Sequence, residues 1–256
     1  MRYALLLSYD GTNYGGWQIQ KNAVTVQQKL TQALEDMLGY KVNVTASGRT
    51  DSGVHARAQV CHFDAETSIP AEKLAGALNA RLPEDISVLQ TVVAPEGFDA
   101  QSSAKRKTYC YRFYTSESRQ PLNDRYSVHI KHSVDFNKLE YSAKIFEGEH
   151  DFKAYCASGS QVKTTVRTIY AIKVEASGCN IAISVTGNGF LYNMVRTLVG
   201  TMIYYASGRL TEDDIMKTIT KCDRNFVGKT MPAKGLTLES VEYEYKLFNN
   251  IFTKSF

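Results

Sequence analysis

One short segment carries the side chains best suited to chemistry: Gly48-Arg49-Thr50-Asp51-Ser52-Gly53-Val54-His55-Ala56. Its two glycines bracket one carboxylate and one guanidinium, and strand-like sequences lie on both sides of it. Loops that a rigid sheet supports are common places for catalytic groups. An ionised carboxylate there could act as a nucleophile or as a general base. The alternative is a plain turn in which Asp51 hydrogen-bonds to its own backbone.

A second segment combines aromatic rings with positive charge. Three aromatic side chains share one face of a strand expected at 107–115: Tyr109, Tyr111 and Phe113. Four cations accompany them, with no acidic residue between positions 101 and 116: Lys105, Arg106, Lys107 and Arg112. Rings and cations together are typical of surfaces that bind nucleic acid, because bases stack on the rings while the cations bind phosphates. Each cation could also be solvated surface charge, and each ring could belong to the core.

The composition of the 256-residue chain excludes several other kinds of protein. Apolar residues make up 43% and charged residues 22%, as in globular proteins, which excludes extended disorder. The net charge of +4 permits a polyanionic partner. The five cysteines are an odd number without a C-x-x-C pair, and the five histidines show no metal-ligand spacing with them. We therefore expect neither a disulfide framework nor a metal site.

One glycine pair could suggest a nucleotide cofactor. Gly187-Asn188-Gly189 resembles the start of a dinucleotide-binding loop, but Tyr192 stands where the third glycine is required. Close packing of two backbone segments is the better interpretation of these glycines. We therefore expect no nucleotide cofactor.

The elements that must position these segments alternate between strands and helices. Strand patterns occur at 3–9, 42–46, 58–63, 86–93, 107–115, 167–175, 180–186 and 237–245. Helix patterns occur at 26–38, after Pro70, at 135–146, at 191–206 and after Thr211. Thr25 and Gln28 have the spacing of a capping box before the first helix, and Gly39 follows it. The pattern predicts two α+β halves of similar size.

The segment 116–134 is the expected link between the halves, since it contains Pro121, Asn123 and Asp124. The expected division is an N-terminal half at 1–115, a C-terminal half at 116–245 and a tail at 246–256. The longest nearly apolar stretch, around 198–206, is far shorter than the ~20 residues that span a bilayer. The apolar run at the N-terminus is too short for a signal peptide. Together with the cysteine pattern, these features indicate a cytoplasmic protein without membrane association.

Five ordered motifs resemble those of the tRNA pseudouridine synthase A (TruA) family. The first is Ser8-Tyr9-Asp10-Gly11-Thr12-Asn13-Tyr14 followed by Gly16-Trp17-Gln18, and the second is the segment around Asp51. The remaining three are Lys107-Thr108-Tyr109-Cys110-Tyr111-Arg112, Gly189-Phe190-Leu191-Tyr192-Asn193-Met194-Val195-Arg196 with Gly200, and Pro232-Ala233-Lys234-Gly235-Leu236. The resemblance covers about residues 2–245. Five motifs in family order make a chance match very unlikely.

The resemblance implies a pseudouridine synthase fold. Each half would be a mainly antiparallel sheet with helices on one face, as in ferredoxin-like units, with a catalytic cleft between the halves. The implied activity is isomerisation of uridine to pseudouridine at positions 38, 39 and 40 in the anticodon stem-loop of tRNA. The implied assembly is a homodimer in which each tRNA spans both subunits.

The resemblance also implies roles for single residues. Asp51 would be the catalytic carboxylate and Arg196 its partner, through a bidentate contact that lysine cannot make. Tyr109 would stack on the target uracil, which must be flipped out of the folded RNA. Arg49 would occupy the space that the flipped base leaves, although a contact with a phosphate or carboxylate is the alternative. Leu236 would form part of the apolar wall around the base, or it could serve core packing alone. Six cations are candidates for phosphate contacts, and each could also be solvated surface charge: Lys105, Arg106, Lys107, Lys153, Lys163 and Arg167.

The implied reaction breaks the N-glycosidic bond and joins C5 of the base to C1′. It leaves the oxidation state unchanged, so it requires no cofactor. Asp51 could attack C1′ or C6, or remove the C2′ proton, and the sequence leaves all three open. A non-catalytic RNA-binding module is the competing hypothesis, although a pure binder needs no buried ion pair. A glycoside hydrolase would use two carboxylates at one site, where this loop offers one.

Overall fold

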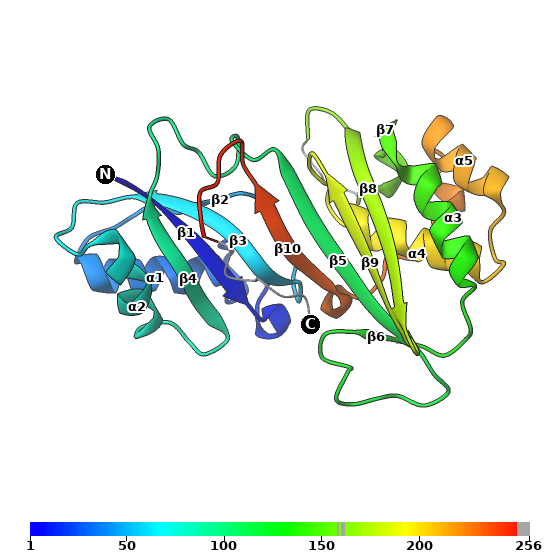
Figure 1. Ribbon diagram of the computed structural model, residues 1–256, viewed down its shortest axis with the longest axis horizontal. Coiled ribbons are helices and arrows are strands. Elements are labelled where there is room, and N and C mark those ends of the chain that lie inside the picture. Colours follow the sequence, from blue (N-terminus) through cyan, green and yellow to red (C-terminus); the bar gives the residue numbers. More distant parts are fainter. Residues whose placement is uncertain (158, 160–161, 250–256) are drawn as a thin grey trace. The chain divides into compact units, whose positions relative to one another are not determined.

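The computed structural model describes residues 1–157, 159 and 162–249. The chain divides into two compact units (Figure 1). The first consists of Met1–Lys105 and the chain from Leu238 onward, and the second of Arg106–Thr237. The division therefore precedes strand β5 (Arg106–Thr115), whereas the sequence suggested a boundary after this strand. The reason is that β5 pairs with a strand of the second unit.

The first unit contains a mainly antiparallel sheet in the order β4, β1, β3. β1 (Arg2–Tyr9) lies between β3 (His55–Asp64) and β4 (Ile86–Val93) and is antiparallel to both. β10 (Leu236–Glu242) adds its residues from 238 onward beside β3. The strand expected at 42–46 is reduced to the two residues of β2 (Thr45–Ala46), which pair with β3. Val42 and Val44 are nevertheless buried, so their alternation reports core packing and not strand pairing.

Two helices cover one face of this sheet (Figure 1). α1 (Val26–Leu38) begins after Thr25, whose hydroxyl accepts a hydrogen bond from the Gln28 N–H. It ends at Gly39, whose φ of 79° is left-handed. α2 (Ala71–Asn79) begins after Pro70 and contacts both α1 and β4. The predicted start and end of α1 are confirmed, because the Thr25 cap and the left-handed Gly39 fix them locally. α2 also begins after Pro70 as predicted, although no side chain caps it.

The opposite face of the sheet is covered by chain without regular helices. Residues of β1 and β3 form an apolar cluster with Phe98 and Ala100: Ala4, Leu6, Ala58 and Val60. Side chains after β10 pack against this cluster: Tyr243, Leu247 and Phe248. The tail therefore has a packing role as far as Phe248. The remainder of the tail, 250–256, lies outside the described residues.

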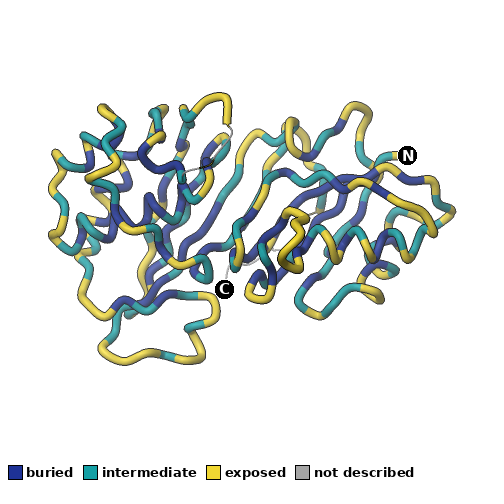
Figure 2. Tube along the Cα trace, turned by 180° about the vertical axis from the view of Figure 1, so that it is seen from behind, coloured by how far each residue is buried: buried dark blue, intermediate teal, exposed yellow. Residues whose placement is uncertain are grey.

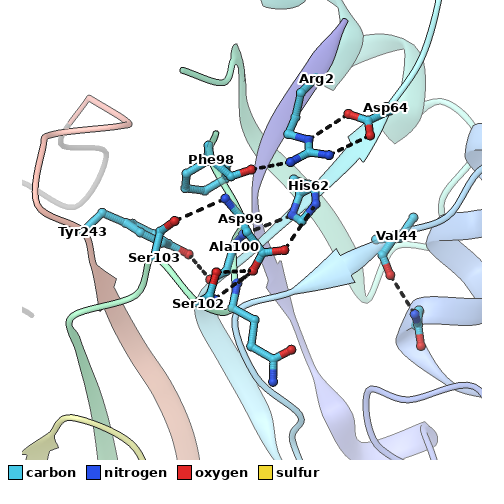
Figure 3. A network of polar contacts seen from close by, with 12 residues as sticks. Arg2, Val44, His62, Asp64, Phe98, Asp99, Ala100, Ser102, Ser103 and Tyr243 are labelled. Atoms are coloured by element: carbon cyan, nitrogen blue, oxygen red, sulfur yellow. Dashed lines mark hydrogen bonds and ion pairs between the residues drawn. The ribbon is translucent and has the colours of Figure 1, made fainter. Parts of the chain in front are cut away.

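A polar network holds the chain that follows β4 against this sheet (Figure 3). Arg2 donates from Nε and Nη2 to the two carboxylate oxygens of Asp64, both at 2.8 Å, and from Nη1 to the carbonyl oxygen of Phe98 at 2.6 Å. Nδ1 of His62 accepts the Ala100 N–H at 3.1 Å. Burial and the nearby Arg2 lower the pKa of His62. The imidazole therefore remains neutral at physiological pH and keeps Nδ1 as an acceptor.

The second unit contains a sheet in the order β5, β9, β8, β7. β8 (Val166–Ser177) and β9 (Asn180–Gly187) form the hairpin expected from the sequence, and β7 (Gly148–Asp151) pairs with β8. These pairs are antiparallel, whereas the short β6 (Val128–Ile130) lies parallel to β5. β6 falls inside 116–134, which we expected to be a plain link. Three residues are too few for a periodic pattern to predict a strand.

Three helices belong to the second unit: α3 (Phe136–Phe146), α4 (Met194–Ala206) and α5 (Glu212–Thr220). α3 contacts β8, α4 contacts β5, and α5 contacts β7. α4 begins three residues later than expected because Asn193 adopts a left-handed φ of 62°. Each unit is thus an α+β unit whose sheet is mainly antiparallel, which confirms the predicted fold class. Figure 2 shows the buried residues concentrated in the strands and α4.

The described part of the chain also contains short 3₁₀ turns, at Gly11–Asn13, Lys153–Tyr155, Arg224–Phe226 and Ala233–Gly235. All five cysteines lie in the described part of the chain, and no disulfide joins any of them. None of the described helices is both long enough and apolar enough to cross a membrane.

The apolar cluster on the helix-free face gives a test of this packing. Phe98 is 1% exposed and packs edge-on against Tyr243 with a centroid separation of 5.2 Å. Replacement Phe98→Ala should lower the free energy of unfolding by about 3–5 kcal/mol, since it leaves a cavity. Urea denaturation followed by circular dichroism measures this change. Leu122→Ala is the control because Leu122 is 99% exposed, and equal effects of both variants would contradict the packing described.

Candidate functional site

The loop that carries Asp51 connects β2 to β3, and two buried polar side chains fix its beginning. The Ser47 hydroxyl donates to Oε1 of Gln59 at 2.6 Å, and Nε2 of Gln59 donates to the carbonyl oxygen of Gly48 at 2.9 Å. Both side chains are fully buried. A buried, satisfied hydrogen-bond pair of this kind specifies one loop conformation, because each broken bond would leave an unpaired polar group in the core.

A second loop, formed by residues 10–17, packs directly against the Asp51 loop. The Trp17 N–H donates to the carbonyl oxygen of Thr50 at 3.0 Å. The Gly53 N–H and the Ser52 hydroxyl both donate to the carbonyl oxygen of Tyr14, each at 3.3 Å. These bonds lie on both sides of Asp51. The backbone of Asp51 is therefore held between Thr50 and Ser52, both of which form hydrogen bonds with the second loop.

This contact requires glycine on the second loop. A Cβ on Gly16 would lie 2.5 Å from the carbonyl oxygen of Thr50, and Gly16 has a φ of 94°. A Cβ on Gly11 would lie 2.0 Å from the carbonyl oxygen of Val54. Neither distance leaves room for a side chain, and the neighbouring atoms belong to the backbone and cannot move aside cheaply. The first motif of the sequence thus supplies the surface against which the Asp51 loop is built.

Tyr14 ties this second loop to the residue before β4. Its hydroxyl donates to Oδ1 of Asp85 at 2.5 Å, and the Asp10 N–H donates to the carbonyl oxygen of Asp85 at 2.9 Å. Burial and the Asp85 carboxylate raise the pKa of Tyr14, so the phenol remains a donor at physiological pH. A chain of contacts therefore runs from Asp85 through Tyr14 to the residues on either side of Asp51. Sequence reasoning assigned no role to Tyr14 or Asp85.

Asp51 is half-buried and Arg49 is exposed on the same loop. The turn after Asp51 closes through its main-chain carbonyl oxygen, which accepts the Val54 N–H at 3.1 Å. The hydroxyl groups of Tyr9 and Thr50 lie 2.8 Å apart beneath the loop. The structure therefore places both predicted residues of this loop just before β3, with Arg49 accessible to a ligand.

In the second unit, Arg196 lies in the first turn of α4 and its guanidinium is held from two directions. Nη1 donates to Oδ1 of Asn193 at 2.8 Å, and Nε donates to the carbonyl oxygen of Met231 at 2.7 Å. The Met231 N–H donates in turn to the carbonyl oxygen of Arg196 at 3.3 Å. Asn193 has a left-handed backbone, and its side chain reaches Arg196 three positions further along the chain. The arginine is thus oriented by its own unit.

The segment that holds Arg196 approaches α4 closely. A Cβ on Gly200 would lie 1.9 Å from the carbonyl oxygen of Lys229, which excludes any side chain there. The Gly228 N–H donates to Oγ1 of Thr201 at 2.9 Å, and the hydroxyl groups of Thr197 and Thr230 lie 2.9 Å apart. These contacts fix the path of the chain toward Met231. Gly228 is required by the same approach, since its Cβ would lie 2.5 Å from the carbonyl oxygen of Gly200. The sequence predicted no contact between these two glycines.

Tyr109 lies on β5 and is 8% exposed. Its ring meets that of Phe190 edge-on, with centroids 5.3 Å apart and planes at 89°. Two positions further along the strand, the Tyr111 hydroxyl donates to the carbonyl oxygen of Pro232 at 2.8 Å. This bond anchors the segment that leads to Leu236, which is 5% exposed. Contacts within the second unit thus orient Tyr109, the predicted stacking residue, and anchor the segment that precedes Leu236.

The three consecutive cations have different surroundings. Lys105 lies in the first unit, with Nζ 3.7 Å from a carboxylate oxygen of Glu244. The Arg106 guanidinium lies 4.8 Å from the ring centroid of Tyr170. Burial lowers the pKa of Lys107, and the nearby Arg167 lowers it further. Neighbouring residues of a strand point to opposite faces, so Arg106 and Lys107 lie on opposite faces of β5.

Two features concern the possible binding of a metal ion or a nucleotide. Among the described residues, no group of three or more His, Cys, Asp or Glu side chains could hold a metal ion. A Cβ on Gly187 would lie 2.9 Å from the carbonyl oxygen of Thr168 and 3.2 Å from the Phe190 ring. Close packing therefore accounts for the first glycine of the Gly187-Asn188-Gly189 segment.

Comparisons with known proteins agree in pointing to one family. A family model described as tRNA pseudouridine synthase matches residues 6–101 and 142–244. The tRNA pseudouridine synthase A of Ruminiclostridium cellulolyticum is 46% identical over 240 residues, which are 93% of this chain and 98% of that protein. The namesake protein of Caldicellulosiruptor bescii is 42% identical over 244 residues, 95% of this chain and 100% of that protein.

A third relative, tRNA pseudouridine synthase A of Halalkalibacterium halodurans, is 41% identical over 236 residues, with 92% and 90% of the two chains covered. Among solved structures, a chain in a Cbf5-Nop10-Gar1 complex matches 92% of this chain and 57% of its own length at 13% identity, with a TM-score of 0.41. A TM-score this low establishes no common fold by itself.

The packing at Gly16 gives a second test. Gly16→Ala should speed hydrogen exchange at the Gly53 amide, because an added Cβ separates the loops that the Gly53–Tyr14 hydrogen bond joins. Exchange measured by NMR or mass spectrometry reports this opening. Gly39→Ala is a matched control: its φ of 79° is similarly left-handed, but no atom lies within 4 Å of the added Cβ. Unchanged Gly53 exchange in Gly16→Ala would contradict the contact.

Proposed function

The chain belongs to the tRNA pseudouridine synthase family, and on that premise we propose that it converts uridine to pseudouridine at positions 38, 39 and 40 in the anticodon stem-loop of tRNA. Membership of the family makes the protein an isomerase that acts on tRNA. The observation that supports catalysis by this chain is the hydrogen-bonded loop that presents Asp51, within the matched range 6–101, whereas the three tRNA positions rest on the family resemblance.

We assign the chemical step to Asp51. The reaction breaks the bond between N1 and C1′, forms a bond between C5 and C1′, transfers the C5 proton to solvent and returns a proton to N1, so atoms and electrons balance without an oxidant. Asp51 could act on C1′, on C6 or on the C2′ proton. Each route requires a carboxylate at a fixed position beside the sugar. The contacts of Tyr14 and Trp17 on either side of Asp51 support this requirement.

The second unit supplies residues whose positions are also fixed. Tyr109, held edge-on by Phe190, is suited to stack on the target uracil. Leu236 is assigned to the apolar wall around the base. The two hydrogen bonds that orient the Arg196 guanidinium support a positioning role for it. Its pairing with Asp51 stays a prediction from the resemblance.

Binding of the tRNA should depend mainly on phosphate contacts, for which Arg49, Arg106 and Lys107 are candidates. Arg49 is exposed and can enter the space that a flipped base leaves. Lys105 is a weaker candidate, because Glu244 already lies beside it. The homodimer, the cytoplasmic location and the lack of a required cofactor stay predictions.

The first test of the proposal removes the carboxylate. Asp51→Asn and Asp51→Ala should retain tRNA binding and lose turnover, because phosphate contacts dominate affinity whereas the carboxylate serves the chemical step. Tritium release from tRNA labelled at uracil C5 measures turnover, and substrates with one target uridine each report the choice of position. Turnover above a few per cent of the unmodified protein in Asp51→Ala would exclude the assignment. Binding without release by the unmodified protein would favour a non-catalytic RNA-binding module.

A second test separates two roles of Tyr109. Tyr109→Phe keeps the stacking face and loses the hydroxyl, whereas Tyr109→Leu loses both. We expect turnover to fall to a similar extent in both variants, because the hydroxyl takes part in proton handling as well as the ring in stacking. Tyr141→Phe serves as the control, since Tyr141 is 49% exposed on α3. Near-normal turnover in both Tyr109 variants would remove this residue from the site.

A further inference from the structure

Two cations of the second unit come from strands that flank a glycine. Lys107 of β5 lies opposite Gly187 of β9, and Gly187 lies opposite Ile169 of β8. Arg167 precedes Ile169 by two positions and so shares its face of the strand. Adjacent strands are about 4.8 Å apart, so long side chains from β5 and β8 can approach each other across β9. Gly187 itself contributes no side chain there, and the ring of Phe190 packs against it.

The guanidinium of Arg167 is held in place by main-chain atoms. Nη1 donates to the carbonyl oxygens of Thr164 at 2.9 Å and Val166 at 2.6 Å. On its other side, Nε lies 3.8 Å from the position that a Cβ on Gly189 would occupy. A guanidinium fixed in this way loses little entropy when it binds a ligand.

The charge of Arg167 acts on Lys107. Burial lowers the pKa of Lys107, and the charge of Arg167 lowers it further. Burial also lowers the pKa of Arg167. A phosphate that contacts both side chains would accept a charge-assisted hydrogen bond from each.

The cation pair lies next to the aromatic pair of the proposed active site. Lys107 and Tyr109 are two positions apart on one strand face, a spacing of about 6.6 Å. The Phe190 ring lies against Tyr109 and also 3.2 Å from the position of a Gly187 Cβ. The rings and the cations therefore adjoin the same glycine. Within a nucleotide, the base and the nearest phosphate are separated by a distance of the same order.

From this arrangement we propose that Lys107 and Arg167 form a binding site for one RNA phosphate, the phosphate adjacent to the nucleotide whose base stacks on Tyr109. The inference rests on the proposed function and adds to it a named subsite for the substrate backbone. Arg106 does not belong to the subsite, because it lies on the opposite strand face, over the ring of Tyr170. The subsite would fix the sugar of the target nucleotide relative to the strand that carries Tyr109.

Charge removal at the subsite is the first part of the test. Lys107→Gln and Arg167→Gln should each raise KM for tRNA about tenfold, because each loses a charge-assisted hydrogen bond. The dependence of log affinity on log salt concentration should become shallower by about one unit in each variant. Lys173→Gln is the matched control: it removes the same charge from an exposed position of β8. Equal effects of Lys173→Gln and Arg167→Gln would overturn the proposal.

Charge removal on the RNA is the second part, and it needs no protein variant to locate the contact. A stem-loop with one target uridine is prepared with single methylphosphonates, which are uncharged, at successive backbone positions. One substitution next to the target uridine should raise KM at least about tenfold in the unmodified protein and have a smaller effect in Arg167→Gln, where only the contact with Lys107 is left to lose. A uniform small effect at every position, or additive effects with Arg167→Gln, would overturn the subsite.

Measurements on the unmodified protein distinguish failure of the proposed function from failure of the phosphate subsite alone. No tritium release by the unmodified protein from any stem-loop substrate would contradict the proposed function and the subsite with it. Normal release, combined with unchanged KM in both subsite variants, would contradict the subsite alone. Thermal unfolding of each variant, compared with Lys173→Gln, shows whether a raised KM reflects lost folding.

Discussion

Direct backbone contact between two loops fixes the position of Asp51, and the account of this protein depends on that contact. The carbonyl oxygens of Thr50 and Val54 lie within 2.5 Å of the positions that Cβ atoms on Gly16 and Gly11 would take, so the loops are too close for a side chain at either glycine. Hydrogen bonds on both sides of Asp51 then close the interface. A carboxylate held in this way needs little reorganisation during a reaction, and such preorganisation is a major source of rate enhancement.

In the second unit, Arg196 is positioned in the same way, by a close backbone contact that requires a glycine. Gly200 allows the chain near Lys229 to lie against α4, and the carbonyl oxygen of Met231 then orients the Arg196 guanidinium. In both units, a glycine allows two backbone segments to approach closely, and a hydrogen bond to a main-chain carbonyl oxygen then joins the two segments. Motifs separated widely in the sequence therefore act as pairs: one member carries the functional group, and the other supplies the surface that holds it.

Local chemistry made part of this predictable from the sequence. The Thr25 cap, the Gly39 terminus and the strand at 3–9 depend on neighbouring residues, and the structure has them as expected, although Tyr3 to Leu7 are all buried and do not alternate. β5 belongs to the second unit because it pairs with β9. The hydrophobic pattern of a strand does not show which other strand it pairs with. The roles of Tyr14 and Asp85 depend on a contact across 71 positions. The different surroundings of Arg106 and Lys107 depend on the ring of Tyr170 and on burial within the second unit, which the sequence does not show.

The most direct test of the central claim is the single-turnover rate of tritium release by Gly16→Ala at saturating tRNA. If the loop contact positions Asp51, the rate should fall at least about tenfold while the dissociation constant for tRNA stays unchanged, since a misplaced catalytic group costs rate and not phosphate contacts. Gly39→Ala should release tritium at the normal rate. A normal rate in Gly16→Ala would contradict the account.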